Sequence, residues 1–532
     1  MALNSLRFAA FFCVFLIVLL LLPKKTRKIW LFVGNCLFYL SFLVSGQSPS
    51  VTVPFIIAFL LLLFSAILVW FCGISLQGSG VRGQESAVKQ NSPVIKHIFF
   101  VSIQDEAHGD WHLVRRSPNK RACPHVRRSS SEQLLFFILP VLWNVGMLVF
   151  FKYTGLIGSL LKGLRVGLPI SAGDILVPVG ISFYTLRCIS YIVDVKRGTI
   201  DAVKNPLDVV LYVAFFPQII SGPIERPGKF FRELAAFQEK DLRNFEAIRR
   251  GFLLFVWGLF QKIVLAERLS VISAHYFNDF TAFGFWELLL ASLAYTFQIY
   301  CDFGGYSDMS RGIAGMMGFE TMHNFRQPYL AQGIKSFWRR WHISLTTWLT
   351  DYVYIPLGGS RKGLLRKYAN IIMVFLVSGL WHGSTLNFLF WGLLHALYQI
   401  LEDLWNRTGR KLPGWLLWLI TFTEVNFAWI FFNAEGLNRG VRIIRQMFSG
   451  FSFPSVWDTG LIPGNLAVLG VGLAVLLLVD VLHEKKVSVF QKVFALPLPL
   501  RWLIFLGLFW MVILLGIYGV GYDTSGFIYA RF

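Results

Sequence analysis

Residues Tyr368–Leu401 read YANIIMVFLVSGLWHGSTLNFLFWGLLHALYQIL, a run of 34 residues without a single Asp, Glu, Lys or Arg. A helix crosses a bilayer with about 20 apolar residues, so this run is long enough for a membrane element. His382 stands in its middle, and an ionisable ring at that depth is a functional-site hypothesis by default. The Gly-Ser pair after His382 predicts two elements, a short recessed helix that ends at His382 and a true span that begins near Leu386.

The rest of the chain has the same apolar character, with 55% hydrophobic and 16% aromatic residues among 532. This composition predicts an all-α polytopic membrane protein. Three apolar stretches are too short or too broken to cross, namely Val209–Ser221, the glycine-rich Gly304–Phe319 and Ile371–His382. Irregular backbone survives at membrane depth only within protein or beside a wet cavity, so these stretches predict re-entrant elements around a recess.

We expect about eleven transmembrane helices, from the apolar runs of suitable length. They are Leu6–Leu22, Ile29–Val44, Val53–Cys72, Leu134–Phe151, Ile175–Val193, Ala247–Leu265, Trp286–Cys301, Leu386–Leu401, Leu416–Phe432, Leu466–Leu482 and Trp502–Tyr518. No small-residue cleavage site follows the first run, so we interpret it as a retained span and not as a signal peptide.

The net charge of +21 is concentrated in short loops beside apolar runs, which is typical of the positive-inside rule and does not indicate nucleic-acid binding. The basic loop Pro23–Lys28 is therefore expected in the cytoplasm and the N-terminus outside. The polar segment from 75 to 133 follows two spans later and is expected on the cytoplasmic side. These features divide the chain into N-terminal transmembrane helices (1–74), a cytoplasmic loop or insertion (75–133) and a transmembrane core (134–532).

No metal site is predicted. The long loop contains several possible ligands, but their spacing matches no common zinc pattern and the segment is polar and serine-rich. The six cysteines are scattered and indicate neither a disulfide framework nor a zinc site. The loop residues concerned are His97, His108, His112, Cys123 and His125.

A basic and aromatic stretch, Lys335–Lys367, precedes the charge-free run and holds seven basic residues and one acid. On a helical wheel Phe337, Trp338, Trp341, Leu345, Trp348 and Leu349 share one side, and Arg339, Arg340 and Thr347 the other. This pattern predicts a helix that lies in the membrane interface, with His342 at the edge of the apolar face.

Three histidines need a choice between structure and chemistry. His395 is better interpreted as a core histidine that hydrogen bonds to a neighbouring helix. For His382 catalysis is favoured, because the glycines on either side, Gly379 and Gly383, allow backbone and substrate to approach closely. For His342 the residues leave both interpretations open.

The run FWRRWHISLTTWLTDYVYIPLGGSR (Phe337–Arg361), followed by GLWHG (Gly379–Gly383), closely resembles the membrane-bound O-acyltransferase family, and within it the alginate O-acetyltransferase branch. The resemblance extends from about residue 130 to the end of the chain. The further motifs are PVGISFYT (178–185), YIVDV (191–195), FPQIISGPI (216–224), YCDFGGYSDM (300–309), NFRQPYL (324–330) and FIY (527–529). Two departures are Arg187, where such sequences usually have a neutral residue, and the long loop from 77 to 133.

The resemblance implies a helical bundle around a central funnel, in which His382 is the principal catalytic residue and His342 lies nearer the cytoplasmic entrance. Acyl transfer from a thioester to a hydroxyl needs a base, and neutral imidazole suits that role. The expected oxyanion donors are Asn387, Ser384 or backbone N–H groups at the break. A covalent acyl-histidine is an open variant.

The supporting residues expected around the donor are Arg339, Arg340, Trp341, Asp302 and Tyr306. The basic stretch would attract the phosphate of a donor, either acetyl-coenzyme A or an acyl-thioester carrier, and no tightly bound cofactor is expected. For Asp302 and Tyr306 a structural role is slightly favoured over orienting a histidine.

The predicted activity is transfer of an acyl group, expected to be acetyl, toward hydroxyls of an exported polysaccharide or cell-wall glycan. The expected partners are membrane lipid, the donor, the glycan and an export-side acyltransferase, at a bacterial inner membrane. One alternative is a D-alanyl transferase of the teichoic-acid type, which uses a carrier-protein thioester. A transporter is the alternative from another class, but the internal symmetry that it would require is not seen.

Overall fold

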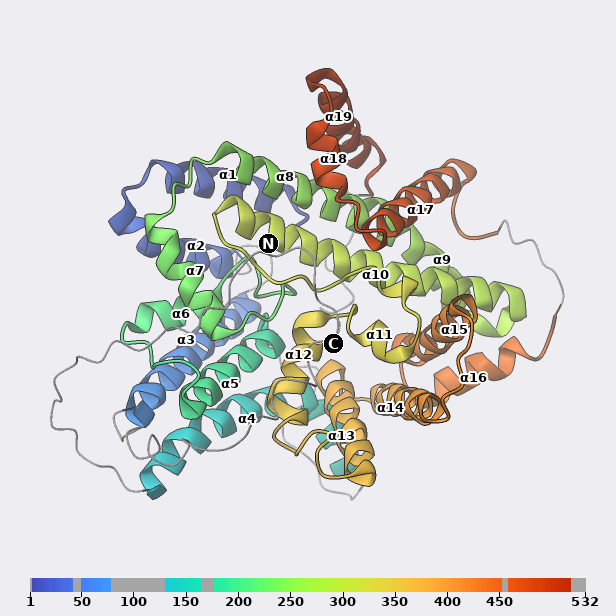
Figure 1. Cartoon of the computed structure of the whole chain (residues 1–532), viewed down its shortest axis with the longest axis horizontal. Helices are drawn as coiled ribbons and strands as arrows, with labels where there is room; N and C mark the ends of the chain where they lie inside the picture. The colour runs from blue at the N-terminus through green and yellow to red at the C-terminus, as the bar shows by residue number, and fades with distance from the viewer. Residues whose placement is uncertain (1, 42–48, 78–129, 164–176, 452–457, 518–532) are drawn as a thin grey trace.

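The computed structural model describes residues 2–41, 49–77, 130–163, 177–451 and 458–517 (Figure 1). All the regular structure in these ranges is helical. Most of the predicted cytoplasmic loop, with its histidines and Cys123, lies outside the described residues, as does the terminal FIY motif.

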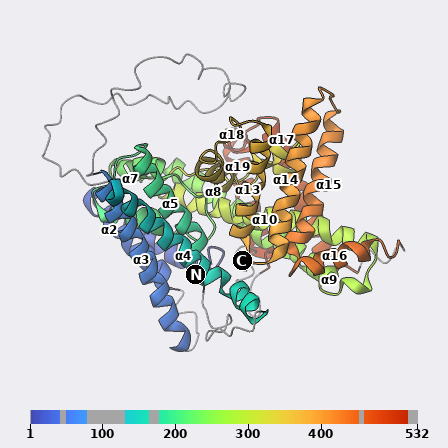
Figure 2. The same ribbon diagram turned by 90° about the horizontal axis from the view of Figure 1, so that it is seen from below.

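The first five helices form one side of the molecule. They are α1 (Leu6–Leu21), α2 (Arg27–Leu40), α3 (Pro49–Gln77), α4 (Ser130–Gly163) and α5 (Ile181–Arg197). In Figure 2, α3, α4 and α5 pack side by side. The hydroxyl of Ser5 begins α1 by accepting a 3.1 Å hydrogen bond from the N–H of Phe8, and Gly198 ends α5 with the positive φ of 69° that glycine allows.

Two short helices follow, α6 (Pro206–Ala214) and α7 (Pro227–Glu239), and the chain between them is irregular. The prediction of a broken segment at Val209–Ser221 is therefore confirmed. The basic loop after α1 lies against this region: Lys28 pairs with Asp208 at 2.9 Å, and Arg27 donates to the carbonyl of Lys240 at 2.7 Å. The predicted cytoplasmic loop and the chain after α7 thus lie on the same face.

Two long helices cross the middle of the molecule side by side (Figure 1). The first is α8 (Phe245–Leu259), which continues through the π-helical turn η3 (Phe260–Ala266) into α9 (Glu267–Asn278); the second is α10 (Phe285–Met316). The prediction that α10 breaks after Cys301 is wrong. Its glycines serve close packing: a Cβ on Gly305 would lie 2.6 Å from the carbonyl oxygen of Gly258, and one on Gly312 2.5 Å from that of Gly251.

The predicted interfacial helix is two short helices, α11 (Ile334–Trp338) and α12 (Ile343–Leu349), followed by a π-helical turn, η6 (Thr350–Tyr354). The chain turns at His342, whose φ is 43°. Prediction of one continuous helix is wrong because that left-handed residue changes the direction of the chain. The apolar side was predicted correctly, since Phe337, Trp341 and Leu345 are all buried.

The charge-free run folds as predicted into two elements, α13 (Leu364–His382) and α14 (Leu386–Arg407). The first is not a short recessed helix, since it begins seven residues before Ile371 and is long and apolar enough to cross a membrane. Lys367 in its first turns pairs with Asp403 of α14 at 2.5 Å, which lets the helix extend through charged residues. Next come α15 (Gly414–Asn433) and α16 (Leu437–Met447), with α14 and α15 side by side in Figure 2.

The last described helices are α17 (Pro463–Glu484), α18 (Val489–Ala495) and α19 (Leu498–Leu515). By length and composition, six helical segments of the described ranges could cross a membrane, which supports a multi-pass membrane protein. They are Ile56–Gln77, Ser130–Thr154, Leu364–His382, Gly414–Asn433, Pro463–Glu484 and Leu498–Leu515, and α1 is a shorter apolar helix.

Candidate active site

His382 is the last residue of α13, and its side chain is buried in a group of aromatic rings. Its ring centroid lies 4.9 Å from that of Trp381, 5.1 Å from Trp391 and 5.1 Å from Phe432. These rings come from α13, α14 and α15, so three helices fix the position of one imidazole. The orientation of the His382 ring is set by its packing against these three flat rings.

Two glycines bring α13 and α14 into backbone contact beside His382. A Cβ on Gly379 would lie 2.4 Å from the carbonyl oxygen of Phe388, and one on Gly392 2.4 Å from that of Phe375. Any larger residue would separate the helices. Gly379 therefore sets the close crossing of the two helices.

His342 is buried at the start of α12, where its left-handed backbone is uncommon for a residue other than glycine. Its ring centroid lies 4.6 Å from that of Phe303 in α10. Burial lowers the pKa of His342 to about 3, so the ring is uncharged at neutral pH. The left-handed backbone is unfavourable for this residue, so the packing around the buried neutral ring must hold His342 in place.

Trp381 connects the two histidines. Its ring lies 5.9 Å from that of His342 and 4.9 Å from that of His382, measured between centroids. Its indole N–H donates to the carbonyl oxygen of Ser182 in α5 at 3.2 Å. The structure thus packs His382 and His342 against one anchored tryptophan.

Two residues of α4 that were not predicted also contact this region. The ammonium of Lys152 donates to the carbonyl of Trp381, and the hydroxyl of Tyr153 donates to the carbonyl of Leu380. The Lys152 nitrogen lies 5.7 Å from the centre of the Trp381 ring. The last turn of α13 has carbonyls without helical partners, and α4 satisfies two of them. A lysine within an apolar run was the available signal.

Arg187, noted as a departure from the family pattern, is fully buried. It donates to the carbonyl of Tyr212 at 2.9 Å and to the side-chain oxygen of Gln218 at 2.6 Å. The first acceptor lies in the last turn of α6, and the second lies in the irregular chain that follows it. Arg187 therefore ties the end of α6 to the irregular chain that follows it.

The other predicted residues are distributed around the site. Asn387 is buried, and its amide donates to the carbonyls of Phe431 at 3.1 Å and Ala434 at 2.8 Å. Both of its hydrogens are thus engaged at the end of α15. Ser384 lies half-buried at the break. Trp341 is buried between aromatic rings, with Phe325 at 4.9 Å and Trp429 at 5.0 Å.

Asp302 and Tyr306 lie in α10 beside a buried ion cluster. Lys262 of η3 pairs with Asp302 at 2.7 Å and with Glu267 at 2.6 Å. The hydroxyl of Tyr306 lies 3.5 Å from the side-chain oxygen of Asn4. These contacts favour the structural role over orientation of a histidine.

The two arginines of the basic stretch differ. Arg339 is exposed, whereas Arg340 forms a two-pronged ion pair with Glu484 at the end of α17, at 2.6 and 3.0 Å. The charge of Arg340 is therefore compensated within the protein.

His395 is fully buried among aromatic rings, with Trp391 at 4.9 Å and Trp338 at 5.0 Å. Its placement in the core agrees with the prediction. Within the described part of the chain neither ring nitrogen has a hydrogen-bond partner, so the predicted bond to a neighbouring helix is not found.

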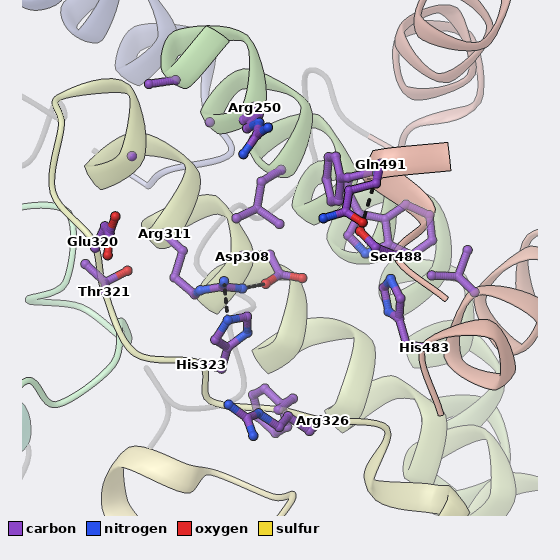
Figure 3. A pocket seen from close by; sticks show the side chains of 18 of the residues that line it. Arg250, Asp308, Arg311, Glu320, Thr321, His323, Arg326, His483, Ser488 and Gln491 are labelled. Atoms are coloured by element: carbon purple, nitrogen blue, oxygen red, sulfur yellow. Dashed lines mark hydrogen bonds and ion pairs between the residues drawn. The ribbon is translucent and has the colours of Figure 1, made fainter. Parts of the chain in front are cut away.

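A cavity of about 1560 Å³ opens between α8, α10, the chain after α10 and the α17–α18 junction (Figure 3). Arg311 projects into it from α10 and bonds to Asp308 at 2.8 Å and to the ring of His323 at 3.1 Å. Arg250, Arg326 and Lys240 are other cations of its wall. A recess beside Gly304–Phe319 was predicted, but the other walls of this cavity were not, because they come from segments far apart in the chain.

Comparison of the sequence with known proteins identifies relatives of this chain. A sequence profile described as the membrane-bound O-acyltransferase family matches residues 196–440, which include both histidines. Three curated relatives are a probable alginate O-acetylase AlgI of Pseudomonas fluorescens, another of Pseudomonas aeruginosa, and a peptidoglycan O-acetyltransferase of Helicobacter pylori.

The identities are 42% over 285 residues, 38% over 358 and 35% over 353, respectively. These matches cover 53%, 66% and 61% of this chain. They span 56%, 66% and 66% of the relatives' own lengths. Together with the profile and the paired histidine motifs, they show that this chain belongs to the membrane-bound O-acyltransferase family.

Proposed function

We propose that this protein transfers an acetyl group from a thioester donor to hydroxyls of an exported polysaccharide or cell-wall glycan, with His382 as the catalytic base. The observation that carries the proposal is the position of His382, at a helix break and inside an aromatic cage formed by three helices. The relatives named for acetylation of alginate and peptidoglycan support both the acetyl group and the glycan acceptor.

In the proposed reaction, neutral His382 takes the proton of the acceptor hydroxyl as its oxygen attacks the thioester carbonyl. The tetrahedral intermediate collapses, the C–S bond breaks, and the proton passes from His382 to the departing thiolate. The buried aromatic surroundings would exclude water, which would otherwise compete with the glycan for the acyl group. An acyl-histidine variant would transfer the group in two steps.

The oxyanion formed during attack needs hydrogen-bond donors. The amide of Asn387 is engaged by the end of α15, which leaves Ser384 and the first N–H groups of α14 as the donors we favour. This helix begins at Leu386, four residues after His382, and within the described ranges its Thr385 N-cap forms no side-chain capping bond. A helix N-terminus carries partial positive charge, which suits a developing oxyanion.

The donor would arrive on the cytoplasmic face. The predicted cytoplasmic loop contacts Lys240 through Arg27, and Lys240 also lines the large cavity. We propose about eleven spans around a central funnel, with the N-terminus outside, His342 toward the entrance and His382 deeper. An export-side acyltransferase would complete transfer to the glycan at a bacterial inner membrane.

The test is transfer of labelled acetyl groups by membranes that contain the full chain. Acetyl-coenzyme A and an acetylated carrier protein are supplied separately, each with and without O-deacetylated alginate or peptidoglycan. We expect acetyl ester to form on a glycan with the wild type and to fall by at least about a hundredfold in His382→Gln, a loss within the usual range for a catalytic base. Transfer from the carrier alone would identify the donor.

His275→Gln is the matched control, because His275 lies half-buried on α9, outside the aromatic cage. It should keep wild-type transfer. Equal transfer by His382→Gln and the wild type, at equal amounts of folded protein, would remove His382 from the reaction.

A further inference from the structure

The large cavity is distinct from the aromatic cage around His382. Its walls include three arginines from three parts of the chain, Arg250 in α8, Arg311 in α10 and Arg326 in the segment after α10 (Figure 3). Its volume of about 1560 Å³ exceeds the roughly 300–1,000 Å³ of ordinary small-molecule pockets. A ligand that fills it would be larger than a simple metabolite.

The cations of the cavity differ in how far they are compensated. Arg250 pairs with Glu246, and Arg311 with Asp308. For Arg326, the described residues provide no side-chain partner: its backbone N–H is engaged, but its exposed guanidinium has no acceptor within hydrogen-bonding distance. Arg326 therefore presents up to five unused donors to the cavity.

The charges of the groups that line the cavity with Arg326 decide whether an anion can bind there. The surrounding protein atoms and then the guanidinium groups of Arg311 and Arg326 lower the pKa of His323. The ring of His323 bonds to Arg311, which has only donors, so that ring nitrogen is an acceptor and the ring is neutral. Acids are also present in the lining, namely Asp241, Glu246, Asp308, Glu320 and Asp480. Two of them are engaged by Arg250 and Arg311, and Asp480 accepts from Tyr300 at 3.0 Å.

Both α8 and α18 also contribute apolar side chains to the cavity. Leu254 and Trp257 face it from α8, and Phe490 and Phe494 from α18. The cavity therefore combines a cationic wall with an aromatic and aliphatic one. A ligand matched to both has an anionic group joined to an apolar or aromatic part.

The cationic wall is connected to His342. Phe325, next to Arg326, lines the cavity, and its ring packs 5.1 Å from that of Phe303, which in turn contacts His342 at 4.6 Å. Two aromatic rings in series, Phe325 and Phe303, thus connect the cavity to His342.

We propose that this cavity binds a phosphate group carried on a larger organic molecule, with Arg326 as its principal ligand and Arg311 beside it. Arginine binds phosphate oxygens through two parallel charge-assisted hydrogen bonds. Two kinds of molecule carry such a phosphate group: coenzyme A, through its diphosphate, and an anionic lipid, through its phosphodiester. Binding of coenzyme A rests on the proposed function, whereas binding of a lipid does not.

The experiment uses the full chain in phosphatidylcholine nanodiscs, without turnover. Equilibrium binding of labelled coenzyme A is one arm, and retention of dioleoyl-phosphatidylglycerol, measured by native mass spectrometry, is the other. We expect Arg326→Gln to weaken one of them by at least about tenfold, the equivalent of about 1.4 kcal/mol. Arg232→Gln, an exposed arginine on α7 outside the cavity, is the matched control and should bind as the wild type does.

Loss in the coenzyme A arm identifies the nucleotide source, and loss in the lipid arm identifies the headgroup source. Unchanged binding of both probes by Arg326→Gln, or an equal loss in Arg232→Gln, would overturn the proposal. His382→Gln is measured in parallel and should keep full binding. If His382→Gln still transferred acetyl groups, the proposed reaction would fail while the phosphate site would stand.

Discussion

The backbone N–H of Arg326 donates a 3.0 Å hydrogen bond to the carbonyl oxygen of Arg340. A second bond, from the N–H of Ile343 to the carbonyl of Asn324 at 2.9 Å, runs beside it. His342 lies between the two paired positions, so the segment that lines the cavity also fixes the backbone of the first histidine. A ligand that moves Arg326 would therefore move His342.

Asn324 is the residue whose loss should test this pairing. Its side chain is buried, and its oxygen accepts from the N–H of Ser344 at 3.4 Å. Asn324→Ala would leave that buried N–H without its partner, at a cost of about 1–3 kcal/mol. We expect a lower thermal midpoint and reduced acetyl transfer. Thr321→Ala, in the same segment but only half-buried, should keep the wild-type midpoint.

The buried imidazole of His342 should make stability depend on pH. Its pKa is about 3 in the folded protein and about 6.5 in an unfolded chain. Between these values the unfolded state binds the proton and the folded state does not, so stability is complete above pH 6.5 and falls as the pH drops toward 3. The loss is roughly 1.4 kcal/mol per pH unit.

In detergent solution this predicts that thermal midpoints at pH 7.5 and 5.5 differ more in the wild type than in His342→Gln. The variant has no group to protonate at that position, so it should lose about 1.4 kcal/mol less on acidification to pH 5.5. The same midpoint difference in both proteins would contradict the burial of a neutral ring.

Gly379 should tolerate no side chain, because its Cβ would lie 2.4 Å from the carbonyl of Phe388. Gly379→Ala forces α13 and α14 apart, and overpacking of this kind costs about 1–3 kcal/mol. Gly470→Ala in α17 is the matched control, since no atom of the described residues lies within 4 Å of its added Cβ. The control should gain up to about 1 kcal/mol from helix propensity. Folded yield and thermal midpoint measure both, and equal values would show that the crossing can relax.

Much of this architecture was predictable from local pattern. The helix break after His382 follows from the Gly-Ser pair, and burial of the aromatic side of the basic stretch follows from its spacing. Helices occur where long apolar runs predicted them, because the apolar pattern of a helix is contained in one continuous segment of the sequence.

What the sequence did not reveal depends on contacts between distant segments. The glycines of α10 suggested a break, but Gly305 and Gly312 meet Gly258 and Gly251 of α8, at matching seven-residue spacing. The turn at His342 has no glycine or proline to announce it and is held by a segment 18 residues earlier in the chain. The cavity required α8, α10 and α18 together, so no single motif predicted it.

Lys262 provides a last test, which separates structure from chemistry at Asp302. Lys262→Met would leave the carboxylates of Asp302 and Glu267 buried together without their cation, and breaking a buried pair costs about 3–5 kcal/mol. Asp302→Asn keeps the pair between Lys262 and Glu267 and should cost much less. The double variant Lys262→Met/Asp302→Asn should recover part of the stability, because one of the two uncompensated charges is gone.

Thermal midpoint and acetyl transfer per folded molecule are measured for all three variants. Since the carboxylate of Asp302 contacts Lys262, the folded fraction of Asp302→Asn should transfer acetyl groups at close to the wild-type rate. A tenfold lower rate at an unchanged midpoint would instead assign Asp302 to the reaction, because a purely structural ion pair cannot slow the chemistry without loosening the fold.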